Sequence, residues 1–143
     1  MDYKSLAKDL LMTRTKLNSL SAGEAMIKMS EGEYCVLAFL FSNERSAHPS
    51  QLSRSMSVST ARIAAILNKL EKKGLILRSC DPTDERKVFA TLTDKGYFEF
   101  SDFLENTLLL LENILEKLGP DDAREYVRIQ KKLLDSCEAN LKE

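Results

Sequence analysis

The stretch LILRSCDPTDERKVFATLTDKG, residues 75–96, decides the fold. Two short runs rich in branched and aromatic residues, Leu75–Leu77 and Val88–Leu92, flank the charged segment Asp81–Lys87, whose Pro and Asp residues favour a turn. The stretch therefore predicts a β-hairpin with a polar, protruding tip. A helical pattern over residues 59–73 precedes the hairpin and a helix start follows it, which gives the order helix, strand, charged turn, strand, helix.

A pair of short helices is predicted immediately before the hairpin. Pro49 suits a first helical position, because the amide proton that it lacks has no partner there, and the first helix is expected over Pro49–Met56. After a turn at Ser57 and Val58, Ser59 is a good N-cap for the second helix. That helix places four apolar residues on one side: Ile63, Ile66, Leu67 and Leu70. Two helices joined by such a turn form a helix-turn-helix, and the hairpin adds a wing, so the sequence predicts a winged helix-turn-helix.

The N-terminal part of the chain is also expected to be helical. A first amphipathic helix is predicted over residues 3–20, and a second one, weakened by Gly23, over residues 22–29. Ser30-Glu31-Gly32-Glu33 has the pattern of a capping box, in which Ser30 accepts from the amide of Glu33 and Glu33 bonds back to the amide of Ser30. The helix that follows is apolar nearly all round, so we expect it at the centre of the core. It carries Tyr34, Val36, Leu37, Phe39, Leu40 and Phe41.

Two long helices are predicted in the C-terminal half. The first covers Asp94–Leu118 with Thr93 as its cap, and Gly119 and Pro120 end it and begin the next. The last helix has an apolar stripe made of Tyr126, Val127, Ile129, Leu133, Leu134 and Leu141. A small winged lobe cannot cover so much apolar surface, so we expect a homodimer that buries it, the alternative being cover by the first helix of the same chain. The predicted fold class is mainly α, with an α+β winged helix and dimerisation helices at both ends.

Length and composition agree with a single cytoplasmic domain over residues 1–143. No apolar run is long enough to span a membrane, and the first residues lack a signal-peptide pattern. Charge divides unevenly: residues 45–95 hold ten Lys or Arg against five Asp or Glu, a balance of +5, and the remainder holds eleven against seventeen, a balance of −6. A basic module between acidic flanks is what phosphate binding requires, although a solvated helix face is the alternative.

Residues typical of catalysis and metal binding are sparse. His48, the only histidine, lies beside a proline in a polar loop, where we expect a solvated imidazole. Asp121 and Asp122 follow a helix start, where they meet the positive end of the helix dipole. Gly-rich phosphate loops, nucleophile motifs and clusters of metal ligands are missing from the sequence, so we expect no enzyme, no cofactor and no metal site. The three cysteines are too far apart in sequence for a zinc or disulfide pattern: Cys35, Cys80 and Cys137.

Three linked motifs resemble the MarR family of transcription regulators. Leu70–Arg78 matches the family pattern L-E-x-x-G-[LY]-[IV]-x-R, Asp84–Arg86 matches D-x-R, and Leu92–Gly96 matches L-T-x-x-G, at the family's spacing. The resemblance covers essentially the whole chain and is most specific over residues 70–96. It implies a sequence-specific double-stranded DNA-binding transcriptional regulator, a ligand-responsive repressor that acts as a homodimer on a pseudo-palindromic operator.

The resemblance also implies roles for particular parts of the chain. The winged lobe would cover residues 30–93, with residues 1–29 and 94–143 as dimerisation helices. The second helix of the helix-turn-helix would enter the major groove and Arg86 the adjacent minor groove, while Asp84 would brace the wing. The DNA-binding residues expected are Ser50, Ser57, Ser59, Thr60, Arg62, Lys69, Arg86 and Lys87. Many relatives carry Thr or Ser followed by Arg where this chain has Ala64 and Ala65, so either Arg62 takes over the base contacts or the operator is read through its shape.

A small aromatic or lipophilic acid is the effector that the resemblance implies, bound between the dimer helices and the winged lobe. Its site would be lined by Leu17, Met26, Met29, Tyr34, Leu37 and Phe41, for which plain core packing is the alternative. Two other hypotheses remain open: a redox-responsive regulator that uses a cysteine, and a winged-helix protein-interaction module without DNA binding. Basic residues retained on the helix-turn-helix and the wing favour DNA binding: Arg54, Arg62, Lys69, Arg86 and Lys87.

Overall fold

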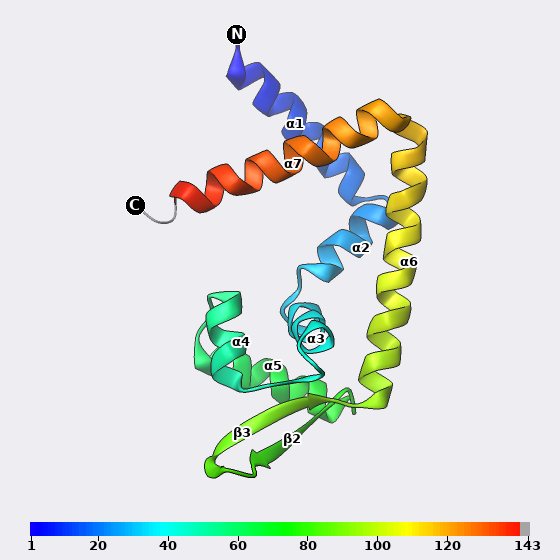
Figure 1. Cartoon of the computed structure of the whole chain (residues 1–143). Coiled ribbons are helices and arrows are strands. Elements are labelled where there is room, and N and C mark those ends of the chain that lie inside the picture. Colours follow the sequence, from blue (N-terminus) through cyan, green and yellow to red (C-terminus); the bar gives the residue numbers. More distant parts are fainter. Residues whose placement is uncertain (141–143) are drawn as a thin grey trace. The chain divides into compact units, whose positions relative to one another are not determined.

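The structure, a computed structural model, describes residues 1–140 and is mainly helical with one small antiparallel sheet (Figure 1). The elements in chain order are α1 (Tyr3–Asn18), α2 (Ser21–Met29), α3 (Gly32–Ser42), β1 (Ser46–Ala47), α4 (Pro49–Met56), α5 (Thr60–Lys72), β2 (Ile76–Asp81), β3 (Asp84–Leu92), α6 (Asp94–Leu118) and α7 (Pro120–Asn140). The predicted order of helix, turn, helix, hairpin and helix is confirmed. Contacts divide the chain into two units, Met1–Thr107 and a second that begins at Leu108.

The core of the first unit lies between α3, α4, α5 and the sheet. On α3, Val36 and Leu40 are fully buried, which confirms the central position expected for this helix. The four residues predicted for the inner side of α5 are all buried: Ile63, Ile66, Leu67 and Leu70. Leu52 of α4 and Ile76 of β2 complete the same cluster. Burial of one apolar face on each element fixes the outward direction of the polar faces.

The sheet has the strand order β1-β3-β2, and all pairs are antiparallel. The hairpin, which we call the wing, comprises β2 and β3 (Figure 1). Its strands are longer than predicted, because the ladder continues past the apolar residues into the charged segment and closes with Asp81 opposite Asp84. The register shifts between Cys80 and Asp81, so residues 85–87 have no partner in the ladder, and the apolar run alone underestimates the strand length.

Strand β1 was not predicted. The polar loop expected around His48 is partly replaced by a strand, because Ser46 pairs with Thr91 and Ala47 with Ala90. A two-residue strand is too short to show any alternation of apolar and polar residues, so the sequence gives no periodic signal for it. Its consequence is that the residue after β1 lies next to the wing.

Three N-caps were predicted, at Ser30, Ser59 and Thr93, and the structure confirms the last two. The Ser59 Oγ accepts from the Arg62 amide at 3.2 Å, and the Thr93 Oγ1 accepts from the Gly96 amide at 3.0 Å. The prediction of a capping box at Ser30 is wrong, since the N-cap of α3 is Glu31. Helix α2 extends to Met29, so Ser30 is its C-cap. The Ser30 hydroxyl donates to the Ile27 carbonyl at 2.6 Å, a local bond that competes with capping of the next helix.

Apolar side chains remain exposed on the terminal helices. Helix α1 buries none of its residues, and Leu10 is 65% exposed. In the second unit, Gly119 adopts a φ of 80° between α6 and α7, and the stripe on α7 is exposed at Tyr126, Val127, Ile129, Leu133 and Leu134. Leu141, the last residue of the predicted stripe, lies outside the described residues. Among the helices of residues 1–140, none combines the length and the apolar character that crossing a membrane demands.

Candidate nucleic-acid interface

Helix α5, the predicted reader helix, presents its first turn to solvent. Ser57 ends α4 in a left-handed conformation with a φ of 52°, and the chain then enters α5 through Val58 and Ser59. Because the apolar face of α5 is buried, the opposite face is open. Six of the predicted DNA-binding residues lie on α4, this turn and α5, and all six are exposed: Ser50, Ser57, Ser59, Thr60, Arg62 and Lys69.

Basic groups on this surface differ in whether they are already engaged. Arg62 and Lys69 form no ion pair within residues 1–140, so their charges are available to an anionic partner. Arg54 instead donates from Nε to the Ser50 carbonyl at 3.3 Å. Ala64 and Ala65 are exposed on α5 and contribute only methyl groups. Arg62 is therefore the side chain of the first turns of α5 with both charge and reach.

An ion pair fixes the C-terminal part of α5 to the wing. The guanidinium of Arg78 on β2 donates to the Glu71 carboxylate and, at 2.5 Å, to the Asn68 side chain. The hydrogen bonds from Arg78 hold the pKa of Glu71 below its ordinary value. Just after the end of α5, Lys73 binds Glu33 of α3 at 2.9 Å, and that bond raises the pKa of Lys73. From the sequence, Arg78 was recognised only as part of a motif, and its ion pair between α5 and the wing was not predicted.

The tip of the wing is closed by two carboxylates. Asp81 Oδ1 accepts from the Thr83 amide at 2.8 Å and from the Thr83 hydroxyl at 2.7 Å, and these bonds lower the pKa of Asp81. Asp84 Oδ1 accepts from the Arg86 amide at 3.0 Å, a geometry that fits the bracing role expected for Asp84. The contribution of Asp81 was not predicted, although an Asp two residues before a Thr in a turn is a recognisable Asx pattern.

Arg86 and Lys87 lie on β3, close to the tip, and both are exposed. Both lie where the register of the ladder shifts, between the pairs Cys80–Val88 and Asp81–Asp84. Neither forms an ion pair within the described part of the chain. The wing thus carries cations near its tip in addition to those of α5.

His48 does not lie in solvent, so that expectation was wrong. Its ring stacks on Phe89 of β3 with centroids 4.0 Å apart, and its side chain is only 26% exposed. The ring nitrogen Nδ1 lies 3.2 Å from the Val88 carbonyl, and Nε2 lies 3.6 Å from Asp81 Oδ2. Strand β1 causes this placement, because its pairing with β3 brings residue 48 against the wing.

Serine hydroxyls of the helix-turn-helix divide into free and engaged groups. Ser53 is half-buried and donates to the Val58 carbonyl at 2.6 Å, so it holds the turn between α4 and α5. Ser59 caps α5, as described above. Ser50 lies exposed in the first turn of α4, where helix amides can also meet a phosphate.

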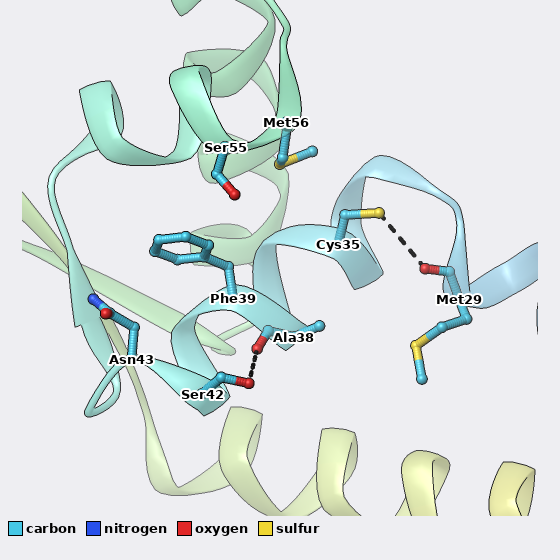
Figure 2. Close-up of a pocket in the computed structure, with 8 residues that line it drawn as sticks. All are labelled: Met29, Cys35, Ala38, Phe39, Ser42, Asn43, Ser55 and Met56. Atoms are coloured by element: carbon cyan, nitrogen blue, oxygen red, sulfur yellow. Dashed lines mark hydrogen bonds between the residues drawn. The ribbon is translucent and has the colours of Figure 1, made fainter. Parts of the chain in front are cut away.

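A cavity of about 470 Å³ lies on the side of α3 that faces the end of α4 (Figure 2). It is lined by Met29, Cys35, Ala38, Phe39, Ser42, Asn43, Ser55 and Met56. Two of its polar groups are bonded locally: the Cys35 thiol lies 3.6 Å from the Met29 carbonyl, and the Ser42 hydroxyl donates to the Ala38 carbonyl at 3.0 Å. All three cysteines of the chain are free thiols.

The six residues predicted to line an effector site are not brought together in this cavity, which contains only Met29 of that set. Leu37 is buried in the core, and Tyr34 and Phe41 pack against Phe103 and Tyr97, at centroid distances of 4.4 Å and 4.9 Å. Leu17 and Met26 are about half exposed. Their role in binding an effector stays a prediction.

Comparison with known proteins places this geometry in a family. The profile described as "MarR family" matches residues 29–88, which include α3, the helix-turn-helix and most of the wing. The chain is similar to the uncharacterized HTH-type transcriptional regulator YkoM of Bacillus subtilis, with 30% identity over 100 residues, covering 70% of this chain and 64% of the relative. It is also similar to the HTH-type transcriptional repressor YetL of the same organism, with 24% identity over 102 residues, covering 71% and 61%. The matched region is therefore less than two thirds of the length of these two relatives.

Solved structures share the fold over nearly the full chain. The YusO protein from Bacillus subtilis superposes with a TM-score of 0.72 at 24% identity, covering 94% of this chain and 99% of that one. The protein Rv1404 from Mycobacterium tuberculosis gives a TM-score of 0.74 at 19% identity, with 94% of each chain covered. With the motifs, the matched profile and the wing geometry in agreement, residues 29–88 carry the winged helix-turn-helix of the MarR family.

Proposed function

We propose that this protein binds double-stranded DNA in a sequence-specific manner and represses transcription by blocking access to a promoter. The observation that carries the proposal is the pair of unengaged arginines on two exposed supports, Arg62 on the first turn of α5 and Arg86 on the wing. An arginine fork suits guanine in the major groove, and its charge suits a narrow minor groove. The name of YetL as a repressor supports the direction of regulation.

The charge distribution supports the same partner. The balance of +5 over residues 45–95 belongs to the segment that holds α4, α5 and the wing, while the rest of the chain is acidic. Cations on one surface raise the local concentration of a polyanion and release its counterions on binding. A DNA-binding regulator of this kind would work in the cytoplasm and without enzymatic activity, as expected for the family whose profile matches residues 29–88.

A homodimer is the form that we propose for the working protein. Helix α1 exposes Leu6, Leu10 and Leu11, and α7 exposes the stripe that includes Leu133 and Leu134. Apolar surface of this extent on two separate helices is typical of an interface between copies. A two-fold dimer would present two α5 helices and two wings, which calls for a pseudo-palindromic operator.

An effector that lowers DNA affinity is the remaining part of the proposal. A small aromatic or lipophilic acid is the class expected from the family, and the cavity beside α3 offers an apolar lining with Met29, Phe39 and Met56. Its lining residues carry no charge, so the carboxylate of such an acid would remain at the solvent side. A compound bound there would touch Ser55 and Met56, directly before the turn into α5.

The test is capture of sheared genomic DNA by the purified protein, sequencing of the retained fragments, and measurement of affinity for the enriched site. We expect one enriched pseudo-palindrome bound well above the nonspecific background at fixed salt. The doubly substituted R62A/R86A protein is the matched control and should retain no enriched site. Equal retention of all fragments by both proteins would contradict the proposal.

A further inference from the structure

His48 connects the first helix of the helix-turn-helix to the wing. It is the residue before Pro49 at the start of α4, where its backbone amide donates to Gln51 Oε1 at 2.8 Å and its carbonyl accepts from the Gln51 amide at 2.9 Å. This local bonding fixes the backbone of residue 48 to α4. The side chain then reaches the wing through the stack on Phe89 and through both ring nitrogens.

Both ring nitrogens face oxygen atoms that only accept hydrogen bonds. Nδ1 faces the Val88 carbonyl at 3.2 Å, and Nε2 faces the Asp81 carboxylate at 3.6 Å. A neutral imidazole carries one proton, so it can donate to only one of the two and turns a lone pair toward the other. The protonated ring donates to the Val88 carbonyl and adds an ionic attraction between Nε2 and the Asp81 carboxylate. A protonated ring therefore contacts the wing through both nitrogens, whereas a neutral ring has one nitrogen without a proton to share.

We propose that His48 is a positioning residue that holds the wing against the helix-turn-helix, and that protonation of its ring strengthens this hold. The effect on DNA rests on the proposed function, because the wing carries Arg86 and Lys87 toward the minor groove. The hold itself does not depend on DNA. Since histidine titrates between about pH 5 and 8, the position of the wing would respond to physiological changes of pH.

The charged groups around this contact come from both strands of the wing. Asp81 on β2 faces His48 directly, and Lys87 on β3 acts on the Asp81 carboxylate and lowers its pKa together with Thr83 and His48. Arg78 of β2 is held by Glu71 on α5. On β3, Asp84 accepts from the backbone at the tip, and Glu85 and Arg86 are exposed. Asp81 is thus the charged partner within ion-pair distance of the ring.

The first arm of the test measures the wing without DNA. NMR order parameters of the amides of residues 82–88 should rise when the wild-type protein is taken from about pH 8 to about pH 6. His48→Phe keeps a ring to stack on Phe89 but has no nitrogen, and Asp81→Asn keeps an oxygen for Thr83 but has no charge. Neither variant should show the rise. An equal rise in all three proteins, or none in the wild type, would overturn the inference.

The second arm measures affinity for the enriched site at the same two pH values and fixed salt. Wild-type affinity should increase about two- to fivefold on acidification relative to both variants, the range expected for a partly exposed ion pair. Asp81→Asn removes the ion pair between His48 and Asp81 but leaves His48 intact. It therefore separates the effect of this ion pair from a direct effect of the imidazolium charge on DNA. If Asp81→Asn keeps the full wild-type increase, the charge acts on DNA directly and the positioning role is wrong.

The third arm is a double-mutant cycle. If His48 acts through the wing, the loss of affinity in His48→Phe should shrink in an Arg86→Ala background and persist unchanged in an Arg62→Ala background. A general loss of folding would couple equally to both arginines, and that result would overturn the inference. Failure of the wild-type protein to bind any site would instead contradict the proposed function, and the NMR arm would still decide the role of His48.

Discussion

Arg62 and Arg86 carry the same charge on supports of different stiffness. Arg62 belongs to a helix that is capped by Ser59 and anchored in the core by Ile63 and Leu67. Arg86 belongs to a two-stranded arm whose tip depends on the hydrogen bonds of Asp81 and Asp84. A rigid helix can hold a side chain in register with one base. A side chain on the wing, close to the DNA backbone, instead responds to the width of the minor groove.

Substitution of the two arginines should therefore have different consequences. Arg62→Ala should cost about 1–3 kcal/mol at particular half-site bases and relax discrimination there, because a bidentate base contact is lost. Arg86→Ala should weaken binding more evenly, and most strongly where flanking A-tracts narrow the minor groove. Affinities for a panel of single-base operator variants at fixed salt give both profiles. Identical profiles for the two variants would contradict separate roles.

Asp81 should make the free energy of unfolding depend on pH in the acid range. Its pKa is lowered by the Thr83 hydroxyl and amide, so the folded protein binds that proton less readily than the unfolded chain. The stabilisation is present above the ordinary value of 3.8 and is lost as the pH falls through the lower, folded value. Wild type and Asp81→Ala, compared by denaturant unfolding, should differ in stability near neutral pH and converge in acid. A difference that is constant down to the acid limit would show that Asp81 acts without its charge.

At the scale of elements, helices were predicted more accurately than strands. The bounds of α4 and α6 follow from Pro49, Thr93 and Gly119, which act locally and leave a clear mark in the sequence. The inner face of α5 follows from its 3.6-residue period. The length of the wing strands and the existence of β1 depend on pairing with residues far along the chain, which no local pattern records.

The candidate site shows the same division. Exposure of Arg62 and Arg86 could be predicted, because it requires only the outward face of a helix and the end of a hairpin. The contacts of His48 and Arg78 could not, since each depends on an interaction between elements: β1 with β3 for His48, and α5 with β2 for Arg78. The capping box at Ser30 failed because two helices compete for one hydroxyl.

The cap of α5 offers a test that separates folding from DNA binding. Ser59→Ala removes the acceptor for the Arg62 amide and should lower the free energy of unfolding by about 1 kcal/mol. Ser59→Asp keeps a capping acceptor and should retain stability, but its charge should repel phosphates and weaken DNA binding. Thermal unfolding and operator affinity are measured on both. Normal DNA affinity in Ser59→Asp would place Ser59 away from the DNA.

At the scale of the whole molecule, the apolar surface on the terminal helices is what the proposed dimer would bury. Leu10 on α1 and Leu133 on α7 are more than half exposed in a chain whose winged lobe buries its own core. Sedimentation should give twice the chain mass of 16.2 kDa at micromolar concentration. Leu10→Glu should shift the population toward monomer, while Leu77→Ser, an exposed apolar position on β2, should not. A wild-type monomer that stays stable and soluble would contradict the dimer.

The central claim is that a two-fold dimer reads DNA with one α5 helix and one wing from each copy. Hydroxyl-radical footprinting on the enriched genomic site tests it most directly. The account predicts protection on one face of the DNA, in two half-sites whose centres lie about 34 Å apart, with flanking minor-groove protection that Arg86→Ala selectively removes. A footprint without a repeat, or flanking protection that survives Arg86→Ala, would contradict it.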